Sequence, residues 1–276
     1  MMTLFFYCQA NLYRYFEDYI NSLLVNIDQK TEVRLYTRPI STDFFKLPEN
    51  DTRDKHIFLQ KVPHEAYKKI NKNRIYLLST EQLSRPGCFD YVCRRNNDNI
   101  IDYSEENIKY YGDRKNVYHI PYQINKQEIY DYKKEKDVAM VANNSPRRWE
   151  IYNEILNRKI NVNNIIGWLE DRDEKLFTHK ILVNVHIDGQ DCKITEQMRI
   201  NRCIFNKIIV ITENSIYQDD LELKPYMLIC KFNKINELVE KVINNYAEYS
   251  NEIFDDFDLD KINRKLLNKL NYFLEH

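Results

Sequence analysis

The apolar run Ile181-Leu182-Val183-Asn184-Val185-His186 leads into a polar stretch that begins with Asp188-Gly189 and ends with Glu196. A helical pattern follows, and then a second apolar run, Lys207-Ile208-Ile209-Val210-Ile211-Thr212. A buried strand, a polar loop, a helix and another buried strand form the unit that carries ligand sites in open α/β sheets. The two carboxylates therefore fall at the carboxyl end of the first strand and at the start of the helix, where the hydroxyls of a nucleotide's sugar need acceptors.

The composition is that of a soluble chain with enough apolar material for two cores. Its 276 residues suit two domains of about 120 to 140 residues each. Charged residues make up 30% and aromatic residues 13% of the chain, and the formal net charge is −1. Such a balance creates no overall field toward nucleic acid or anionic lipid. We therefore expect no nucleic-acid partner.

The cysteines and the first residues indicate a reduced, cytoplasmic protein. Six cysteines are scattered along the chain, and the close pair Cys88 and Cys93 has no nearby histidine to complete a zinc set. The apolar start, Met1 to Cys8, lacks a basic leader and is far shorter than the roughly 20 residues of a membrane span. We expect it to be a core strand, and we expect no transmembrane segment and no metal site.

The first 120 residues alternate between strand and helix patterns. The predicted strands are Thr3 to Cys8, Val33 to Tyr36, His56 to Leu59, Arg74 to Leu78, Asn99 to Ser104 and Val117 to Ile120. Helical spacing covers Leu12 to Val25 and Glu65 to Ile70, and Ser104 is placed to cap a helix that starts at Glu105. This alternation favours a parallel, doubly wound sheet. We assign residues 1–122 to an N-terminal Rossmann-like domain.

A polar linker, Gln123 to Lys136, separates this half from a second one with the same alternation. The predicted strands are Asp137 to Ala142, Asn164 to Trp168, Lys180 to His186, Ile208 to Thr212 and Tyr226 to Cys230. The predicted helices are Pro146 to Leu156, capped by Ser145, then Lys193 to Phe205, Ile235 to Tyr246 and Leu259 to Phe273. The sequence thus predicts an α/β protein with two Rossmann-like doubly wound domains facing a cleft. We expect residues 137–250 to form the second Rossmann-like domain and residues 251–276 a C-terminal helix.

The acidic stretch and several other segments together resemble a known family. Asp188-Gly189 followed by Glu196 is similar to the D/E-x7-E donor-site motif of GT-B glycosyltransferases. Weaker matches, in the same order along the chain, are Ser79 to Leu83, Ile101 to Ser104 with Asn107, His119 to Tyr122, and Asp137 to Ala142 followed by Ser145 to Arg148. The resemblance spans about residues 74 to 240, and the order of the segments carries more weight than any one of them.

The resemblance implies that residues 1–122 are the acceptor-side domain and residues 137–250 the nucleotide-sugar-binding domain. It also implies roles for the acidic residues. Glu196 would accept hydrogen bonds from the ribose of a nucleotide-sugar donor. Asp188 would lie near the transferring sugar, binding its hydroxyls or steadying the developing oxocarbenium charge. Gly189 and Thr195, inside the same motif, are counted with the donor site. Alternatively, both acids are ordinary residues of a loop and a helix start, where carboxylates are favoured.

Arg147 and Arg148 open a helix directly after the first strand of the second half. A helix N-terminus offers free N–H groups and partial positive charge, and an added guanidinium group would make it a diphosphate site. We expect one of the two to serve in this way, although arginine at a helix start is commonly a solvated surface charge. The chain has no glycine-rich phosphate loop of the G-x-G-x-x-G or Walker type.

Other candidates have weaker support. His186, at the end of a buried strand, is expected to bind the donor or shuttle a proton, with a structural role as the alternative. Lys180, Arg199 and Asn201 are further candidates. Glu81 is better explained as a capping acid than as a base. Asp171-Arg172-Asp173 superficially resembles an Asp-x-Asp metal site, but it lies in an acidic connector and is expected to be solvated.

The sequence therefore predicts a metal-independent glycosyltransferase that moves a sugar from a nucleotide-diphosphate donor to a glycan, a protein or a small-molecule acceptor. No cofactor is expected besides the donor, which is a substrate. The alternative is a non-catalytic nucleotide-binding or interaction module with the same fold. A dinucleotide-dependent oxidoreductase is disfavoured because the glycine fingerprint is absent.

Overall fold

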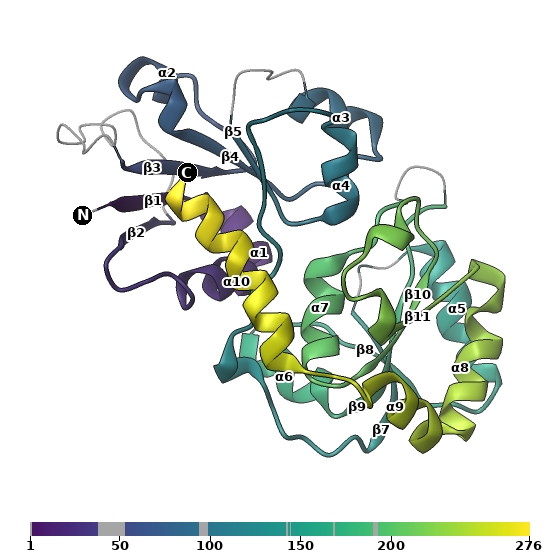
Figure 1. Ribbon diagram of the computed structural model, residues 1–276. Coiled ribbons are helices and arrows are strands. Elements are labelled where there is room, and N and C mark those ends of the chain that lie inside the picture. Colours follow the sequence, from purple (N-terminus) through teal and green to yellow (C-terminus); the bar gives the residue numbers. More distant parts are fainter. Residues whose placement is uncertain are drawn as a thin grey trace. The chain divides into compact units, whose positions relative to one another are not determined.

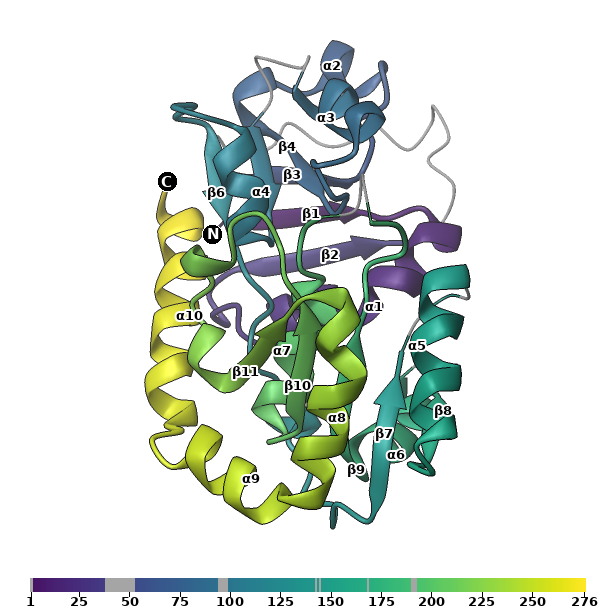
Figure 2. The same cartoon turned by 90° about the vertical axis from the view of Figure 1, so that its right-hand side faces the viewer.

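The chain divides into two units, each built on its own parallel sheet. The first unit comprises Met1–Asn125 and Leu266–His276, and the second comprises Lys126–Lys265. The computed structural model describes residues 2–37, 53–93, 99–141, 143, 145–167, 169–189 and 193–276. Of the predicted features, Ala142, Asn144, Trp168 and the middle of the acidic stretch, residues 190–192, lie outside the described residues. Figures 1 and 2 show the two sheets with their helices.

The sheet of the first unit has six parallel strands in the order β2-β1-β3-β4-β5-β6. Its strands are β1 (Thr3–Tyr7), β2 (Glu32–Tyr36), β3 (Lys55–Leu59), β4 (Ile75–Ser79), β5 (Asn99–Asp102) and β6 (Val117–His119). The helices of this unit are α1 (Ala10–Leu24), α2 (Ala66–Lys69), α3 (Pro86–Cys93), α4 (Glu105–Tyr110) and the end of α10 (Leu259–Glu275). Ser104 caps α4 as predicted, because its side chain accepts a hydrogen bond from the Asn107 N–H.

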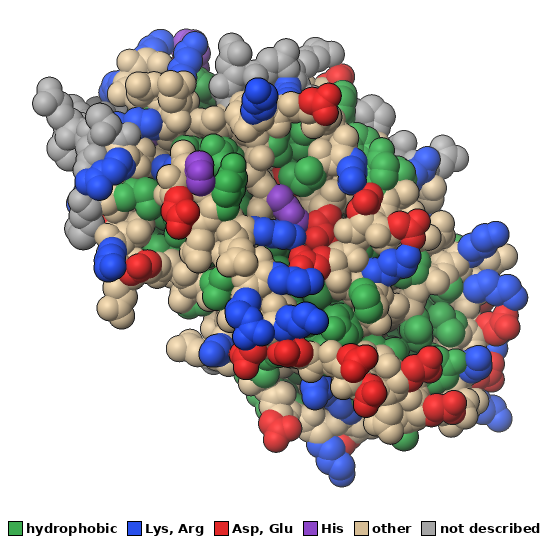
Figure 3. Space-filling view, in the orientation of Figure 1, with side chains coloured by type: hydrophobic (Ala, Val, Ile, Leu, Met, Phe, Trp, Pro, Cys, Tyr) green, Lys and Arg blue, Asp and Glu red, His purple; other side chains and the backbone are tan. Residues whose placement is uncertain are grey.

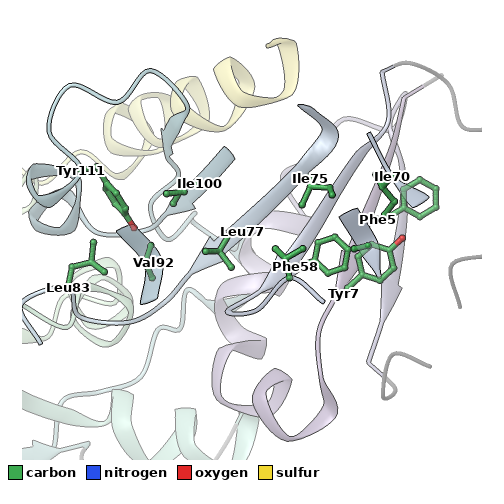
Figure 4. Packing of buried hydrophobic residues seen from close by; sticks show 12 residues of the cluster. Phe5, Tyr7, Phe58, Ile70, Ile75, Leu77, Leu83, Val92, Ile100 and Tyr111 are labelled. Carbon is green, nitrogen blue, oxygen red and sulfur yellow. The ribbon is translucent and has the colours of Figure 1, made fainter. Parts of the chain in front are cut away.

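Alternating side chains give this sheet two apolar faces, as expected for strands covered on both sides. One face carries an aromatic and aliphatic cluster, shown in Figure 4, that includes Phe5, Phe58 and Leu77 and reaches Val92 of α3. The residues of the opposite face line a small apolar cavity with α1 and the end of α10. They are Leu4, Phe6, Ile57, Leu78 and Ile101 of the strands, Leu23 of α1, and Leu270 and Phe273 of α10.

The sheet of the second unit has five parallel strands in the order β11-β10-β9-β7-β8. Its strands are β7 (Lys136–Met140), β8 (Val162–Asn164), β9 (His179–Asn184), β10 (Ile209–Glu213) and β11 (Met227–Cys230). Its helices are α5 (Pro146–Asn157), α6 (Leu169–Phe177), α7 (Gln197–Phe205), α8 (Ile235–Asn244), α9 (Tyr246–Phe254) and the start of α10. Helices α5 and α8 lie on one face of the sheet, and α6 and α7 on the other (Figures 1 and 2). The predicted fold class is therefore confirmed: α/β, with two doubly wound sheets and a C-terminal helix.

Some predicted boundaries are wrong. Strand β8 is Val162–Asn164, earlier than the predicted segment, because Val162 is the residue that pairs with Val138 of β7. The apolar Ile165 and Ile166 belong to the segment after the strand. Helix α7 begins at Gln197 and not at Lys193, so Glu196 precedes the helix. Helices α3, α6 and α9 were not predicted.

The surface of the second unit carries charged side chains of both signs, as a chain with 30% charged residues and a net charge of −1 suggests. Basic and acidic side chains are interspersed over the second unit on the face drawn in Figure 3. Within the described ranges, we find no helix that combines the length and the apolar character required to cross a membrane.

The prediction that Asp171-Arg172-Asp173 is a solvated connector is wrong for two of these residues. They lie in α6, where Arg172 and Asp173 are buried and paired with each other. Arg202 of α7 also donates to both carboxylate oxygens of Asp173, at 3.1 and 2.5 Å, and reaches Glu128 at 2.9 Å. Asp173 is buried because two guanidinium groups compensate its charge. Through Arg202, these ion pairs link α6, α7 and the segment before β7.

Asp173→Asn should strongly destabilise the second unit, because it leaves two buried guanidinium groups facing a neutral amide. We expect the free energy of unfolding to fall by about 3 to 5 kcal/mol, measured by urea denaturation followed by circular dichroism. The matched control is Asp219→Asn, whose carboxylate pairs with Lys224 while 83% exposed and should cost under about 1 kcal/mol. Equal effects of the two substitutions would contradict the role given to Asp173.

Candidate functional site

The candidate site lies at the carboxyl edge of the second sheet, where the strand order reverses. Strand β7 sits between β8 and β9, so the chain leaves β7 toward one side and later returns on the other. Ligands of open α/β sheets bind at such switch points. Helix α5 starts there after β7, and the segment that begins at Val185 leaves β9 at the same edge. Arg147 of α5 donates to the His186 carbonyl at 3.0 Å, so the two segments are in contact.

The start of α5 is fixed by its own sequence. Ser145 accepts a hydrogen bond from the Arg148 N–H at 3.4 Å, and Pro146 occupies the first turn. Proline suits this position because its missing N–H would have no partner inside the helix. The predicted cap and helix start are confirmed, and they place Arg147 and Arg148 in the first turn.

Arg148 is buried and holds the surrounding segments together. Only 6% of its side chain is exposed. Its guanidinium group donates to the carbonyls of Val185 and Asn143, both at 2.9 Å, and lies 3.3 Å from the Glu196 carboxylate. Val185 follows β9, Asn143 precedes α5, and Glu196 precedes α7. Arg148 thus connects three segments of this edge, a role unlike that of a solvated surface charge.

Glu196 forms ion pairs with two arginines. Besides Arg148, it pairs with Arg199 one turn along α7. Arg199 also donates to the Asn184 side chain at 2.9 Å, and Asn184 donates to the Thr212 hydroxyl at 3.0 Å. This ion pair and the two hydrogen bonds therefore fix the Glu196 carboxylate relative to the ends of β9 and β10. Glu196 keeps part of its surface in solvent, with 19% of its side chain exposed.

Arg147 takes a different set of partners. Its Nη1 and Nη2 donate to the two carboxylate oxygens of Glu213, at 3.1 and 2.7 Å, in a bidentate pair. The guanidinium carbon lies 4.1 Å from the centre of the Phe232 ring. A Cβ added at Gly189 would lie 3.4 Å from Arg147 Nε, so the loop at Gly189 runs beside the guanidinium group. Arg147 is more accessible than Arg148, with 24% of its side chain exposed.

His186 is almost fully buried, with 3% of its surface exposed. Its Nε2 lies 3.2 Å from the Asn214 carbonyl, which can only accept, so in the neutral ring Nε2 carries the proton. Nδ1 is then an acceptor, and it finds no hydrogen-bond partner among the described residues. Its backbone N–H donates to Glu213 at 3.2 Å. A buried ring nitrogen without a described protein partner is uncommon, and it belongs to the residue whose carbonyl Arg147 binds.

The remaining predicted residues divide between this edge and other places. Asp188 is half-buried and Gly189 exposed in the turn after β9, whereas Thr195 is fully buried. Lys180 lies near the start of β9 and pairs with Asp137, so it belongs to the opposite edge. Asn201 is buried in α7.

Glu81 belongs to the first unit and is not part of this edge. It accepts from the Gln60 amide at 2.8 Å.

The side chains at this edge of the sheet can form hydrogen bonds and ion pairs with a polar ligand. Glu196, Asp188 and His186 Nδ1 offer acceptors for hydroxyl groups, and Arg147 offers donors for an oxyanion. Burial and nearby Glu213 raise the pKa of the Cys230 thiol to about 11, which makes it a poor nucleophile at neutral pH. Within the described part of the chain, no three histidine, cysteine or carboxylate side chains gather to hold a metal ion.

Two residues of this site were missed by the sequence analysis. Glu213 ends β10 at the same edge, and an acid directly after the run Ile208 to Thr212 was a signal that could have identified it. Phe232 lies just after β11, in a segment with no distinguishing pattern, and only the fold brings it to Arg147.

Comparison with solved structures defines the class of fold. No protein-family model matches the sequence. The Anabaena protein Alr3699/HepE, solved in complex with UDP-glucose, superposes with a TM-score of 0.61 over 99% of this chain and 100% of that protein. The sequences are 10% identical, so the likeness is one of fold. The chain has the two-sheet α/β fold of GT-B proteins.

Comparison with other sequences defines the family. Protein L140 of Acanthamoeba polyphaga mimivirus is 32% identical over 266 residues, which cover 92% of this chain and 84% of L140. Protein R358 of the same virus is 30% identical over 71% of this chain and 72% of R358. The chain belongs to the family of these mimivirus proteins. It spans a smaller share, 28%, of the mimivirus protein L138, to which it is 34% identical.

Arg148→Ala should destabilise the second unit, because it removes the donor of the Val185 and Asn143 carbonyls and a partner of Glu196. We expect a loss of about 2 to 4 kcal/mol in the free energy of unfolding, measured by urea denaturation. The control Arg158→Ala removes an exposed arginine that pairs with Glu240 and should change stability by less than about 1 kcal/mol. A neutral Arg148→Ala would show that the three segments hold together without it.

Proposed function

We propose that this protein is a glycosyltransferase that moves a sugar from a nucleotide-diphosphate donor to an acceptor, without a metal ion. The observation that carries the proposal is the grouping of Glu196, His186 Nδ1 and Arg147 at the switch point of the second sheet. It supplies acceptors for sugar hydroxyls beside a donor for phosphate oxygens. The shared fold with HepE, whose structure was solved with UDP-glucose, supports the same proposal.

Each residue has a distinct part in the proposed reaction. Glu196 accepts hydrogen bonds from the ribose, and Asp188 and His186 face the transferring sugar. As the acceptor hydroxyl oxygen bonds to the anomeric carbon, the bond from that carbon to the diphosphate breaks and negative charge grows on the leaving group, which takes up the hydroxyl proton. Arg147 and the N-terminus of α5 stabilise this charge. No protein nucleophile is required.

Arg147, and not Arg148, is the better candidate for the diphosphate. Arg148 is committed to two carbonyls and to Glu196, and it is the more deeply buried of the two. Arg147 is partly exposed beside Gly189, where the loop has no side chain. The expectation that one of the two arginines serves the ligand thus becomes a specific proposal.

Titration with UDP-, GDP-, dTDP- and ADP-sugars tests the proposal, with binding followed by isothermal calorimetry. We expect one nucleotide class to bind and Glu196→Gln to weaken it by about tenfold, because a good acceptor for the ribose is lost. The control Glu240→Gln changes an exposed acid of α8 and should leave affinity unchanged. The proposal fails if no nucleotide sugar binds, or if Glu196→Gln binds as well as the natural protein.

A second candidate is a non-catalytic nucleotide-binding module. It is favoured by the pairing of Glu196 with Arg148 inside the protein and by Asp188, which is one methylene shorter than the glutamate typical of the motif. Slow hydrolysis of a bound nucleotide sugar, followed by chromatography, separates the two. The enzyme should release the free sugar, and Asp188→Asn should abolish release while the nucleotide still binds.

A further inference from the structure

We propose that Glu213 is a positioning residue of this site: it holds one edge of the Arg147 guanidinium group and thereby presents the other edge to an oxyanion. The inference rests on the proposed function, because it identifies that oxyanion as the diphosphate of the donor. It extends the site to a residue outside the acidic motif.

The hydrogen-bond inventory of Arg147 supports the proposal. A guanidinium group has five N–H donors. Two of them, on Nη1 and Nη2, reach the carboxylate of Glu213, and a second one on Nη1 reaches the His186 carbonyl. The N–H of Nε and the second N–H of Nη2 remain, and no acceptor for either is found among the described residues. These two donors lie side by side and form a fork suited to a phosphate or carboxylate.

The surroundings keep the guanidinium plane in place. Phe232 packs on it at 4.1 Å, and a Cβ added at Gly189 would be in van der Waals contact with Nε and Nη2, at 3.4 and 3.5 Å. Glu213 is itself fixed, because it also accepts from the His186 N–H at 3.2 Å. A planar group with one edge bound and a ring packed on it has little freedom to turn, so its second edge has a defined direction.

The location agrees with an anionic ligand. Arg147 lies in the first turn of α5, a helix of 12 residues, where the free N–H groups favour negative charge. His186, whose carbonyl Arg147 binds, has the buried and unpartnered Nδ1 described above. A partly exposed donor fork and a buried acceptor thus belong to residues in direct contact. A nucleoside diphosphate sugar presents phosphate oxygens and hydroxyl groups to match them.

A double-mutant cycle on the full chain tests the proposal, with UDP and GDP as probes and calorimetry as the measurement. We expect Arg147→Ala to weaken nucleotide binding by about tenfold or more, since a charge-assisted bidentate contact is lost. Glu213→Ala should weaken it several-fold, because the guanidinium group is no longer held. In the Arg147→Ala background, Glu213→Ala should cause no further loss. Glu213→Gln, which keeps one acceptor oxygen, should restore part of the affinity.

The outcomes separate this inference from the proposed function. If neither UDP nor GDP binds the natural protein, both fail. If nucleotide binds and Arg147→Ala weakens it, but Glu213→Ala weakens binding by the same factor with or without Arg147, then Glu213 does not act through Arg147 and the inference alone is overturned. Tighter binding by Glu213→Ala would also overturn it, because Glu213 would then compete with the ligand. Glu237→Ala, an exposed acid paired with Lys234, is the matched control and should bind normally.

Discussion

The buried guanidinium group of Arg148 is the interaction on which the candidate site depends. It comes from the first turn of α5 and reaches the ends of two other segments, at Val185 and Glu196. A buried charge of this kind is tolerated only when its donors are satisfied, so the three segments are constrained to meet around it. The position of His186, one residue after Val185, and that of Glu196 follow from this constraint.

Arg147 and Arg148 are adjacent in the sequence but bind different partners, because successive residues of a helix point in different directions. Successive residues of an α-helix are about 100° apart around the axis, so the side chains of Arg147 and Arg148 leave the helix in different directions. Arg148 points to the end of β9 and the start of α7, and Arg147 to the end of β10. The first holds the edge together and the second, in our proposal, presents donors to the ligand. The net charge of the chain is close to zero, and at this site the charges form two separate ion pairs, Arg147 with Glu213 and Arg148 with Glu196.

Much of the fold could be predicted from the sequence, because buried parallel strands appear as apolar runs and helix starts carry caps. Ser145 with Pro146, and Ser104, are local signals that need no partner far along the chain. The predictions were wrong where the environment of a residue depends on residues far along the chain. From the sequence, Asp173 was predicted to be solvated. In the structure it is buried and paired with Arg202, which lies 29 positions away in the chain. Within the site, Asp188, Glu196 and the arginines could be nominated from spacing, but their pairing could not. Phe232 gave no signal because its role arises only when β11 is placed beside β10.

The most direct test of the central claim is a crystal structure of the protein soaked with a nucleotide sugar that binds it. The account predicts the ribose within hydrogen-bond distance of the Glu196 carboxylate and a phosphate oxygen on the Nε and Nη2 edge of Arg147. A nucleotide held elsewhere, for example at the carboxyl edge of the first sheet with Glu196 and Arg147 untouched, would contradict it.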